Sequence, residues 1–355
     1  MQTAPATPKL RLNEIDLLRF FAALTVVFYH YSFRGYAADD MTTMYYPLLA
    51  RFAKYGYLGV NLFFIISGFV ILMTASEGSV RKFIASRMAR LYPAFWVACT
   101  LTFLVTLALG GERYSATFNQ YLVNMTMLSE FFQVPPIDGA YWSLFVEIKF
   151  YLLVAALLFL RQIRHAEKIF IVWLAASLVL EFIYSDGYLY YWLAVSFSAY
   201  FIAGAMYYLI WSKGLSVTRI VVLLISWGLA LYQAYGDAAY RIKRYKTAMN
   251  QMVVAEIVTL FFVVMLLVAL KKTWGLGKFK WQALGALTYP LYLIHQHIGF
   301  MIFNAAPRAM NIHLLFWAVF ALALAVAYGI SQVEKISAPR FKHGLRRLLW
   351  LEEKK

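Results

Sequence analysis

Charged residues are scarce in this chain of 355 residues. Asp, Glu, Lys and Arg together make up 14% of it, whereas hydrophobic residues make up 63%. A soluble globular domain is typically about half apolar and about a quarter charged. This composition, with a mean hydropathy of +0.65, excludes an ordinary soluble domain and indicates an integral membrane protein.

Cysteine is almost absent. The single cysteine, Cys99, excludes both a disulfide framework and a cysteine-based metal site. It lies within an apolar run, where we expect a small core residue. The sequence also lacks a G-x-S-x-G elbow, a Gly-rich phosphate loop and an H-E-x-x-H pair. We expect no metal site and no permanently bound cofactor.

The formal net charge is +16. A basic chain often binds nucleic acid, but in a chain this apolar we expect Lys and Arg to anchor cytoplasmic loops against anionic lipid. Two thirds of these residues fall in segments that a cytoplasmic N-terminus would place inside. The sequence therefore predicts no nucleic-acid partner, and both termini in the cytoplasm.

A membrane-spanning helix requires about 20 mostly apolar residues. The hydropathy pattern predicts an all-α, polytopic transmembrane helix bundle. We expect the stretch 118–134, which ends in Pro135-Pro136, to be a re-entrant or interfacial element on the outer side. The ten predicted spans are 16–33, 58–76, 91–110, 140–160, 168–185, 190–211, 218–235, 250–270, 283–303 and 311–332.

The sequence predicts one membrane domain, 1–335, followed by a basic tail, 336–355. This tail is amphipathic, so we expect it to lie on the inner membrane surface. The segment "YRIKRYK" (240–246) is an exception to the charge rule, because it carries four basic residues in a loop assigned to the outside. Either this loop binds an anion or the assigned topology is locally wrong.

The first predicted span, "DLLRFFAALTVVFYHY", contains three ionisable residues: Asp16, Arg19 and His30. Arg19 and His30 are eleven residues apart, which places them on one face of a helix, separated by about 16 Å. Asp16 can pair with Arg19, three residues later. A snorkelling Arg and an isolated buried His would give the same pattern, but ionisable groups within a span usually mark a functional site.

Polar residues also occur within, or just before, three later spans. Asn61 and Ser67 lie in a glycine-containing span, whose glycines favour close helix packing. Arg87 and Arg90 project from one face of the next helix, where they can bind phosphate oxygens or simply anchor the inner side. We expect Glu147 to lie at the depth of His30 and to pair with it, either for general-base catalysis or as a buried ion pair.

The ninth span places His295 deep in the outer half, one turn after Tyr292. Because this helix offers His295 no obvious polar companion, we rank it below His30. The charged and polar residues of these spans could equally form a proton relay or a substrate pathway in a transporter or flippase. The sequence shows neither an inverted repeat nor paired broken helices.

The motifs "GYLGVNLFFIISGF", "RMARLYPAFW", "YWSLFVEIKFYLL" and "TYPLYLIHQ", together with Arg19 and His30, occur in a fixed order over roughly residues 12–335. This ordered set resembles the integral-membrane acyltransferase-3 family. Many members of that family carry an extra extracytoplasmic hydrolase-like domain, for which we expect no room here. The resemblance implies a multi-pass protein of the bacterial inner membrane.

The resemblance also implies an O-acyltransferase that moves an acyl group, most often acetyl, from acyl-coenzyme A to a hydroxyl of an envelope or exported glycan. It implies that His30 is catalytic, and the expected depth of Glu147 makes that carboxylate its partner. A covalent acyl-His intermediate is a second route. An acceptor loaded at the cytosolic face is a further alternative. The donor contacts would be Arg19, Arg87, Arg90 and Tyr92, and the supporting or acceptor-side residues Asp16, Asn61, Ser67, Trp142, Ser143, Tyr292 and His295.

Overall fold

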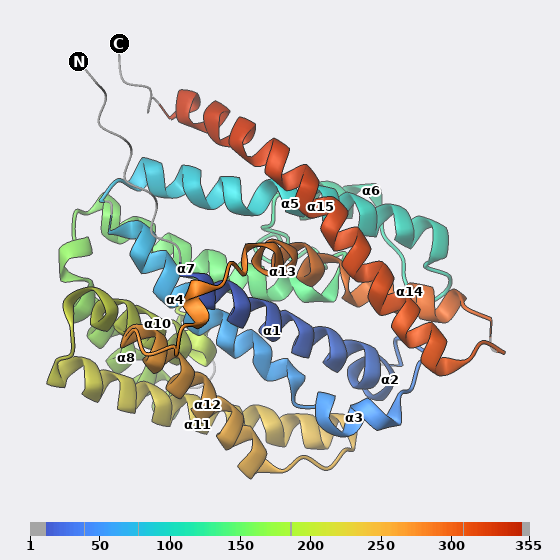
Figure 1. Ribbon diagram of the computed structural model, residues 1–355, viewed down its shortest axis with the longest axis horizontal. Coiled ribbons are helices and arrows are strands. Elements are labelled where there is room, and N and C mark those ends of the chain that lie inside the picture. Colours follow the sequence, from blue (N-terminus) through green and yellow to red (C-terminus); the bar gives the residue numbers. More distant parts are fainter. Residues whose placement is uncertain (1–11, 39, 77, 185–186, 308, 350–355) are drawn as a thin grey trace.

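The computed structural model describes residues 12–38, 40–76, 78–184, 187–307 and 309–349, and these residues form helices joined by turns, with no strand among them. Within these ranges, seven helical segments are long and apolar enough to cross a membrane. The expected all-α, polytopic bundle is therefore confirmed. Figure 1 shows the helices running side by side along the long axis of the molecule.

Each predicted span coincides with helical structure. Three of the predicted spans are not among these seven segments: one is a short helix (α1), one is a charged helix (α8), and one is broken into two helices (α13 and α14). The total of ten spans therefore stays a prediction. The longer helices are α1 (Asn13–Tyr29), α4 (Gly59–Ala75), α5 (Val80–Leu109), α7 (Trp142–Phe159), α8 (Ala166–Ile183), α10 (Val195–Lys213), α11 (Val217–Tyr245), α12 (Gln251–Ala269), α13 (Gln282–Ile294), α14 (Gln296–Ala305) and α15 (Ile312–Leu348). The shorter elements are the π-helical turn η1 (His30–Arg34), α2 (Gly35–Ala37), α3 (Pro47–Ala53), η2 (Gly56–Leu58), α6 (Phe118–Asn124), η3 (Gly139–Tyr141), η4 (Ile163–His165), α9 (Tyr188–Trp192) and η5 (Leu276–Lys278).

Helix α1 lies at the centre of the bundle, where it packs against α4 and α13 (Figure 1). Helix α4 also packs closely on α10. A Cβ at Gly68 would collide with the Phe201 carbonyl, and one at Gly204 would collide with the Ile65 carbonyl. The packing role expected for the glycines of this span is therefore confirmed, because the two backbones meet without side chains between them.

Contacts at the two ends of the bundle show that successive helices alternate in direction. At one end, the Asn13 side chain donates to the Gly277 carbonyl, and Arg81 donates to the carbonyl of Leu349. At the opposite end, Asn304 donates to the Met41 carbonyl. The segments expected inside thus lie together, as do those expected outside. We call the first end the terminal end, because the described chain begins near it with Asn13 and finishes near it with Leu349.

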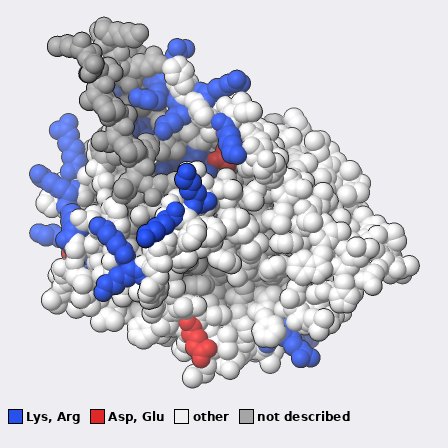
Figure 2. Space-filling model, viewed as in Figure 1, with Lys and Arg blue, Asp and Glu red and all other residues white. Residues whose placement is uncertain are grey.

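Lys and Arg gather at the terminal end. Figure 2 shows them over this side of the visible face, while the opposite half of that face is nearly free of charge. The arrangement is the one expected if the terminal end faces the cytoplasm.

The stretch 118–134 folds back along α5. The Tyr92 hydroxyl donates to the Thr126 carbonyl, and the Trp96 indole N–H donates to the carbonyl of Met125. Both donors precede the end of α5 at Leu109 by several turns. Of the two predicted forms, this geometry favours a re-entrant element, whose free backbone groups are satisfied by neighbouring side chains.

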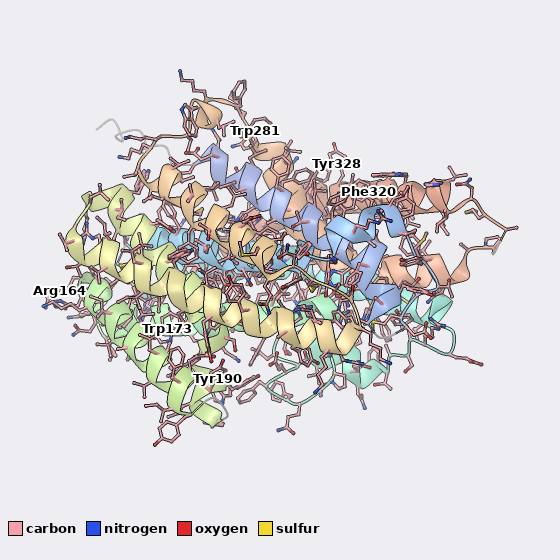
Figure 3. All side chains as sticks on the ribbon, turned by 90° about the horizontal axis from the view of Figure 1, so that it is seen from below. Arg164, Trp173, Tyr190, Trp281, Phe320 and Tyr328 are labelled. Carbon is pink, nitrogen blue, oxygen red and sulfur yellow. The ribbon has the colours of Figure 1, made fainter. Side chains whose placement is uncertain are left out.

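Two helices extend beyond their predicted ends. Helix α11 continues to Tyr245, so the basic stretch 240–246 is mostly helix rather than a loop; Figure 3 shows α11 crossing the molecule as one long helix. Helix α15 continues to Leu348, so the expected boundary between the domain and the tail, at 335, falls inside a helix. Residues 350–355 of that tail lie outside the described residues.

Candidate active site

A cavity of about 500 Å³ opens among α1, α4, α5, α7, α13 and α15. Its walls carry three arginines, so we call it the arginine cavity. Its polar and charged lining residues are Arg19, Ser67, Ser86, Arg87, Arg90, Ser143, Glu147, Tyr151, Thr288, Tyr289, Tyr292, Glu334 and Lys342.

The two arginines of α5 are oriented by different neighbours. The Arg87 Nη2 donates to the Thr74 hydroxyl at 3.1 Å, whereas its buried Nε has no hydrogen-bond partner within the described ranges. Arg90 forms an ion pair with Glu334 of α15, at 2.8 Å between Nη1 and Oε1. Both side chains are half-buried, and both face the same cavity. Guanidinium groups so placed can bind phosphate oxygens in pairs of parallel hydrogen bonds.

Deeper in the same cavity, Glu147 accepts a hydrogen bond from the Ser67 hydroxyl at 2.6 Å. Arg19 lies within electrostatic reach of Glu147, Arg90 and Asp16. The Asp16 carboxylate rests against Gly285 of α13. The expected grouping of Arg19, Arg87 and Arg90 around one cavity is therefore present in the structure.

A second cavity, of about 580 Å³, lies further along α1, next to the arginine cavity. We call it the histidine cavity, because His30 is on its wall. Its polar and aromatic lining residues are Tyr29, His30, Arg34, Tyr57, Asn61, Trp142, Glu181, Tyr190, Ser196, Phe197, Tyr200, Tyr232, Gln233, Asp237, Arg241, Tyr245, Tyr292 and Gln296.

His30 is hydrogen-bonded to the buried His295, which lies at the junction of α13 and α14. The His295 Nδ1 lies 2.8 Å from the Tyr292 carbonyl oxygen, and its Nε2 lies 3.1 Å from the His30 Nδ1. A carbonyl oxygen can only accept, so in neutral rings the proton of His295 is on Nδ1 and its Nε2 accepts. The proton of His30 is then on Nδ1, and this N–H also donates a hydrogen bond to the Val26 carbonyl, at 2.9 Å.

The consequence is that the second ring nitrogen of His30, Nε2, is unprotonated. It makes no hydrogen bond within the described part of the chain, so its lone pair can take a proton. His30 also begins the π-helical turn η1, which widens the end of α1 before Arg34. Such turns often occur at functional sites, because the local change in winding redirects a side chain.

The two cavities share a wall formed by Val60 and Tyr292. The Tyr292 hydroxyl hydrogen-bonds to the Ser143 hydroxyl at 2.6 Å, and its ring packs edge-on against Phe63. Tyr292 also supplies the carbonyl that fixes the proton on His295. One residue thus borders both cavities and orients the histidine pair.

Two expectations from the sequence require correction. Glu147 does not pair with His30, because it contacts Ser67 in the arginine cavity while His30 contacts His295. Tyr92 is not a lining residue of the arginine cavity, since its hydroxyl is directed at the Thr126 carbonyl.

The remaining predicted residues divide between the two cavities. Asn61 donates to the Tyr200 hydroxyl and lines the histidine cavity together with the partly exposed Trp142. Ser67 and Ser143 line the arginine cavity. His295 is fully buried behind His30, and its contact there was missed because its partner belongs to a helix 265 residues earlier.

Sequence reasoning also missed three residues of α11 in the histidine cavity: Gln233, Asp237 and Arg241. They recur at every fourth position, which is the spacing of a single helix face. That regularity was a usable signal. It was hidden because the predicted span ended at 235, between the first residue and the second.

The fold and the two cavities define a multi-pass membrane protein with sites at different depths of one bundle. The chain matches the family described as an acyltransferase domain over residues 12–332. It therefore belongs to the integral-membrane acyltransferase-3 family, as the ordered motifs indicated.

Curated relatives are similar over part of their length. The chain is 30% identical to "Nodulation protein 10" of Rhizobium leguminosarum over 167 residues (41% of this chain and 44% of that protein). It is 29% identical to "Acyltransferase MdmB" of Streptomyces mycarofaciens over 149 residues (40% and 38%). It is 27% identical to "Peptidoglycan O-acetyltransferase OatA" of Listeria monocytogenes over 175 residues (43% and 25%). The chain thus spans less than half the length of these relatives. No solved structure matches it.

Proposed function

We propose that this protein is a membrane O-acyltransferase of the bacterial inner membrane, which moves an acyl group, such as acetyl, from acyl-coenzyme A to a hydroxyl of an envelope or exported glycan. The observation that carries this proposal is the pair of cavities divided only by a shared wall. One cavity presents arginines toward the basic terminal end, and the other presents the unprotonated nitrogen of a histidine.

The donor occupies the arginine cavity. Arg87 and Arg90, at its outer edge, bind the phosphates of the nucleotide, and Arg19 lies further along the bundle. The pantetheine arm then carries the thioester toward the wall of Val60 and Tyr292. Glu147 belongs to this donor side, where it sets the charge around Arg19 rather than orienting the imidazole.

The acceptor hydroxyl occupies the histidine cavity. The His30 Nε2 removes the hydroxyl proton while the oxygen forms a bond to the thioester carbonyl carbon. The carbon–sulfur bond then breaks, and the departing thiolate takes the proton from the His30 imidazolium. General-base assistance of this kind contributes about 10²–10⁴ in rate.

The test is thiol release from acetyl-coenzyme A by the purified protein in nanodiscs, with and without an envelope glycan extract. His30→Ala should lower the glycan-dependent rate about 10²- to 10⁴-fold, whereas the matched change His165→Ala, at an exposed position of η4, should not. Folded wild-type protein that neither binds acetyl-coenzyme A nor releases thiol would contradict the proposal and favour a transporter. Full activity in His30→Ala would remove His30 from the chemistry.

A further inference from the structure

The histidine cavity extends well beyond His30, to a wall formed by α8, α9 and α11. This wall carries Glu181, Tyr190, Gln233, Asp237 and Arg241. Tyr190 is labelled in Figure 3, close to the end of α8. None of these residues belongs to the motifs that relate the chain to its family, so their contacts are the only guide to what this part of the cavity binds.

The basic segment 240–246 does not make this wall an anion site. The Arg241 Nε donates to the Asp237 carboxylate at 3.0 Å, and its Nη1 donates to the Tyr29 hydroxyl at 2.6 Å. Its guanidinium also lies 4.0 Å from the centre of the Tyr57 ring. Its charge is therefore already matched and its plane already stacked within the protein.

The formal charges around the whole cavity also cancel. Two arginines, Arg34 and Arg241, are matched by two carboxylates, Glu181 and Asp237. An anionic ligand would bring a net negative charge into a cavity that has no net positive charge to receive it. Because burying an unmatched charge is costly, this balance favours an uncharged ligand.

Two buried polar atoms of this cavity lack hydrogen-bond partners within the described ranges: the Gln233 Oε1 and the Tyr57 hydroxyl. The amide of Gln233 is held in one orientation, because its Nε2 donates to Glu181 at 2.7 Å and to the Val195 carbonyl at 3.0 Å. Its free oxygen can therefore only accept. Buried polar groups in native proteins are nearly always satisfied, so this oxygen requires a donor from outside the described chain, either an ordered water or a ligand that takes its place.

We propose that this wall is the specificity site of the acceptor, and that it binds an uncharged, hydroxyl-rich sugar. The Gln233 Oε1 and the Tyr57 hydroxyl hydrogen-bond to sugar hydroxyls that neighbour the one acylated at His30. The aromatic faces of Trp142 and Tyr232 cover the apolar side of the ring. This inference rests on the proposed function, and it specifies the acceptor class that the family motifs leave open.

The substitution Gln233→Leu tests the inference, because it keeps the approximate volume of the side chain but removes the acceptor oxygen. Binding is measured by calorimetry without any acyl donor, using short oligomers of N-acetylglucosamine and, as the charged counterpart, oligomers of glucuronic acid. Wild-type protein should bind the neutral oligomers more tightly. Gln233→Leu should weaken that binding about 10- to 100-fold, the range for an unpaired buried polar group. The matched change Gln251→Leu, at an exposed position of α12, should not weaken it.

Acetyl transfer to the same oligomers provides the second measurement. Gln233→Leu should raise the KM for the sugar and leave the KM for acetyl-coenzyme A unchanged, which a general loss of folding would not do. Preference for glucuronic acid oligomers, binding of neither oligomer by wild-type protein, or unchanged sugar binding in Gln233→Leu would each overturn the inference. Sugar binding without any thiol release would instead contradict only the proposed transferase function.

Discussion

His295 illustrates how a residue can act on a reaction that it does not touch. It is fully buried, and its Nε2 accepts a hydrogen bond from the His30 Nδ1–H. The carbonyl of Tyr292 fixes the arrangement from behind. We infer that His295 is a positioning residue: together with the Val26 carbonyl, it keeps the proton of His30 on Nδ1, which leaves Nε2 available as the proposed base.

This role predicts a graded series at position 295. His295→Phe removes the accepting nitrogen and should lower kcat up to about 10-fold, because the His30 Nδ1–H then keeps only the Val26 carbonyl as an acceptor. His295→Gln supplies an amide oxygen and should recover part of that rate. The KM for acetyl-coenzyme A should stay constant in both, since the arginine cavity is untouched. Equal losses in the two variants, with equal loss of thermal stability, would indicate a structural role only.

At the scale of the element, hydropathy and helix periodicity predicted where the helices lie, but not where they change winding or how far they extend. The predicted span 16–33 assumed one uniform helix, whereas the π-helical turn η1 begins at His30. The ends of α11 and α15 were missed for a different reason: both continue as charged, amphipathic helix beyond the apolar span. These features depend on packing against other helices, which a local pattern does not contain.

The extension of α15 leads to a prediction about the donor. Glu334 lies on this helix and holds Arg90 at 2.8 Å in the arginine cavity, so it occupies a position that a phosphate would take. Glu334→Gln should lower the KM for acetyl-coenzyme A a few-fold, roughly what one partly exposed ion pair contributes. Glu256→Gln, on the exposed side of α12, provides the control. A higher KM in Glu334→Gln would show instead that Glu334 holds Arg90 in its binding position.

At the scale of the whole molecule, contacts between the ends of distant helices show at which end of the bundle the basic segment 240–246 lies, which charge counting left open. The basic segment 240–246 was consistent with either an outer position or a local error in topology. In the structure, Arg241 donates to Tyr29, and Tyr55 contacts the Asn250 backbone, so this segment lies at the same end as the connection between α1 and α4. The family-wide motifs pointed to His30 and to the arginines, whose roles are proposals, while the wall of α11 required the assembled bundle.

The same arrangement predicts which residues can be labelled from each side of the membrane. The only cysteine, Cys99, is buried, so new cysteines can be placed in the natural chain without background reaction. Lys54→Cys and Lys243→Cys should react with a membrane-impermeant maleimide added to spheroplasts, because both lie at the end away from the termini. Lys278→Cys, at the terminal end beside Asn13, should react only after the membrane is permeabilised. Labelling of Lys54→Cys and Lys243→Cys from opposite sides, or of all three from outside, would contradict the bundle, and labelling of Lys278→Cys alone from outside would contradict its orientation.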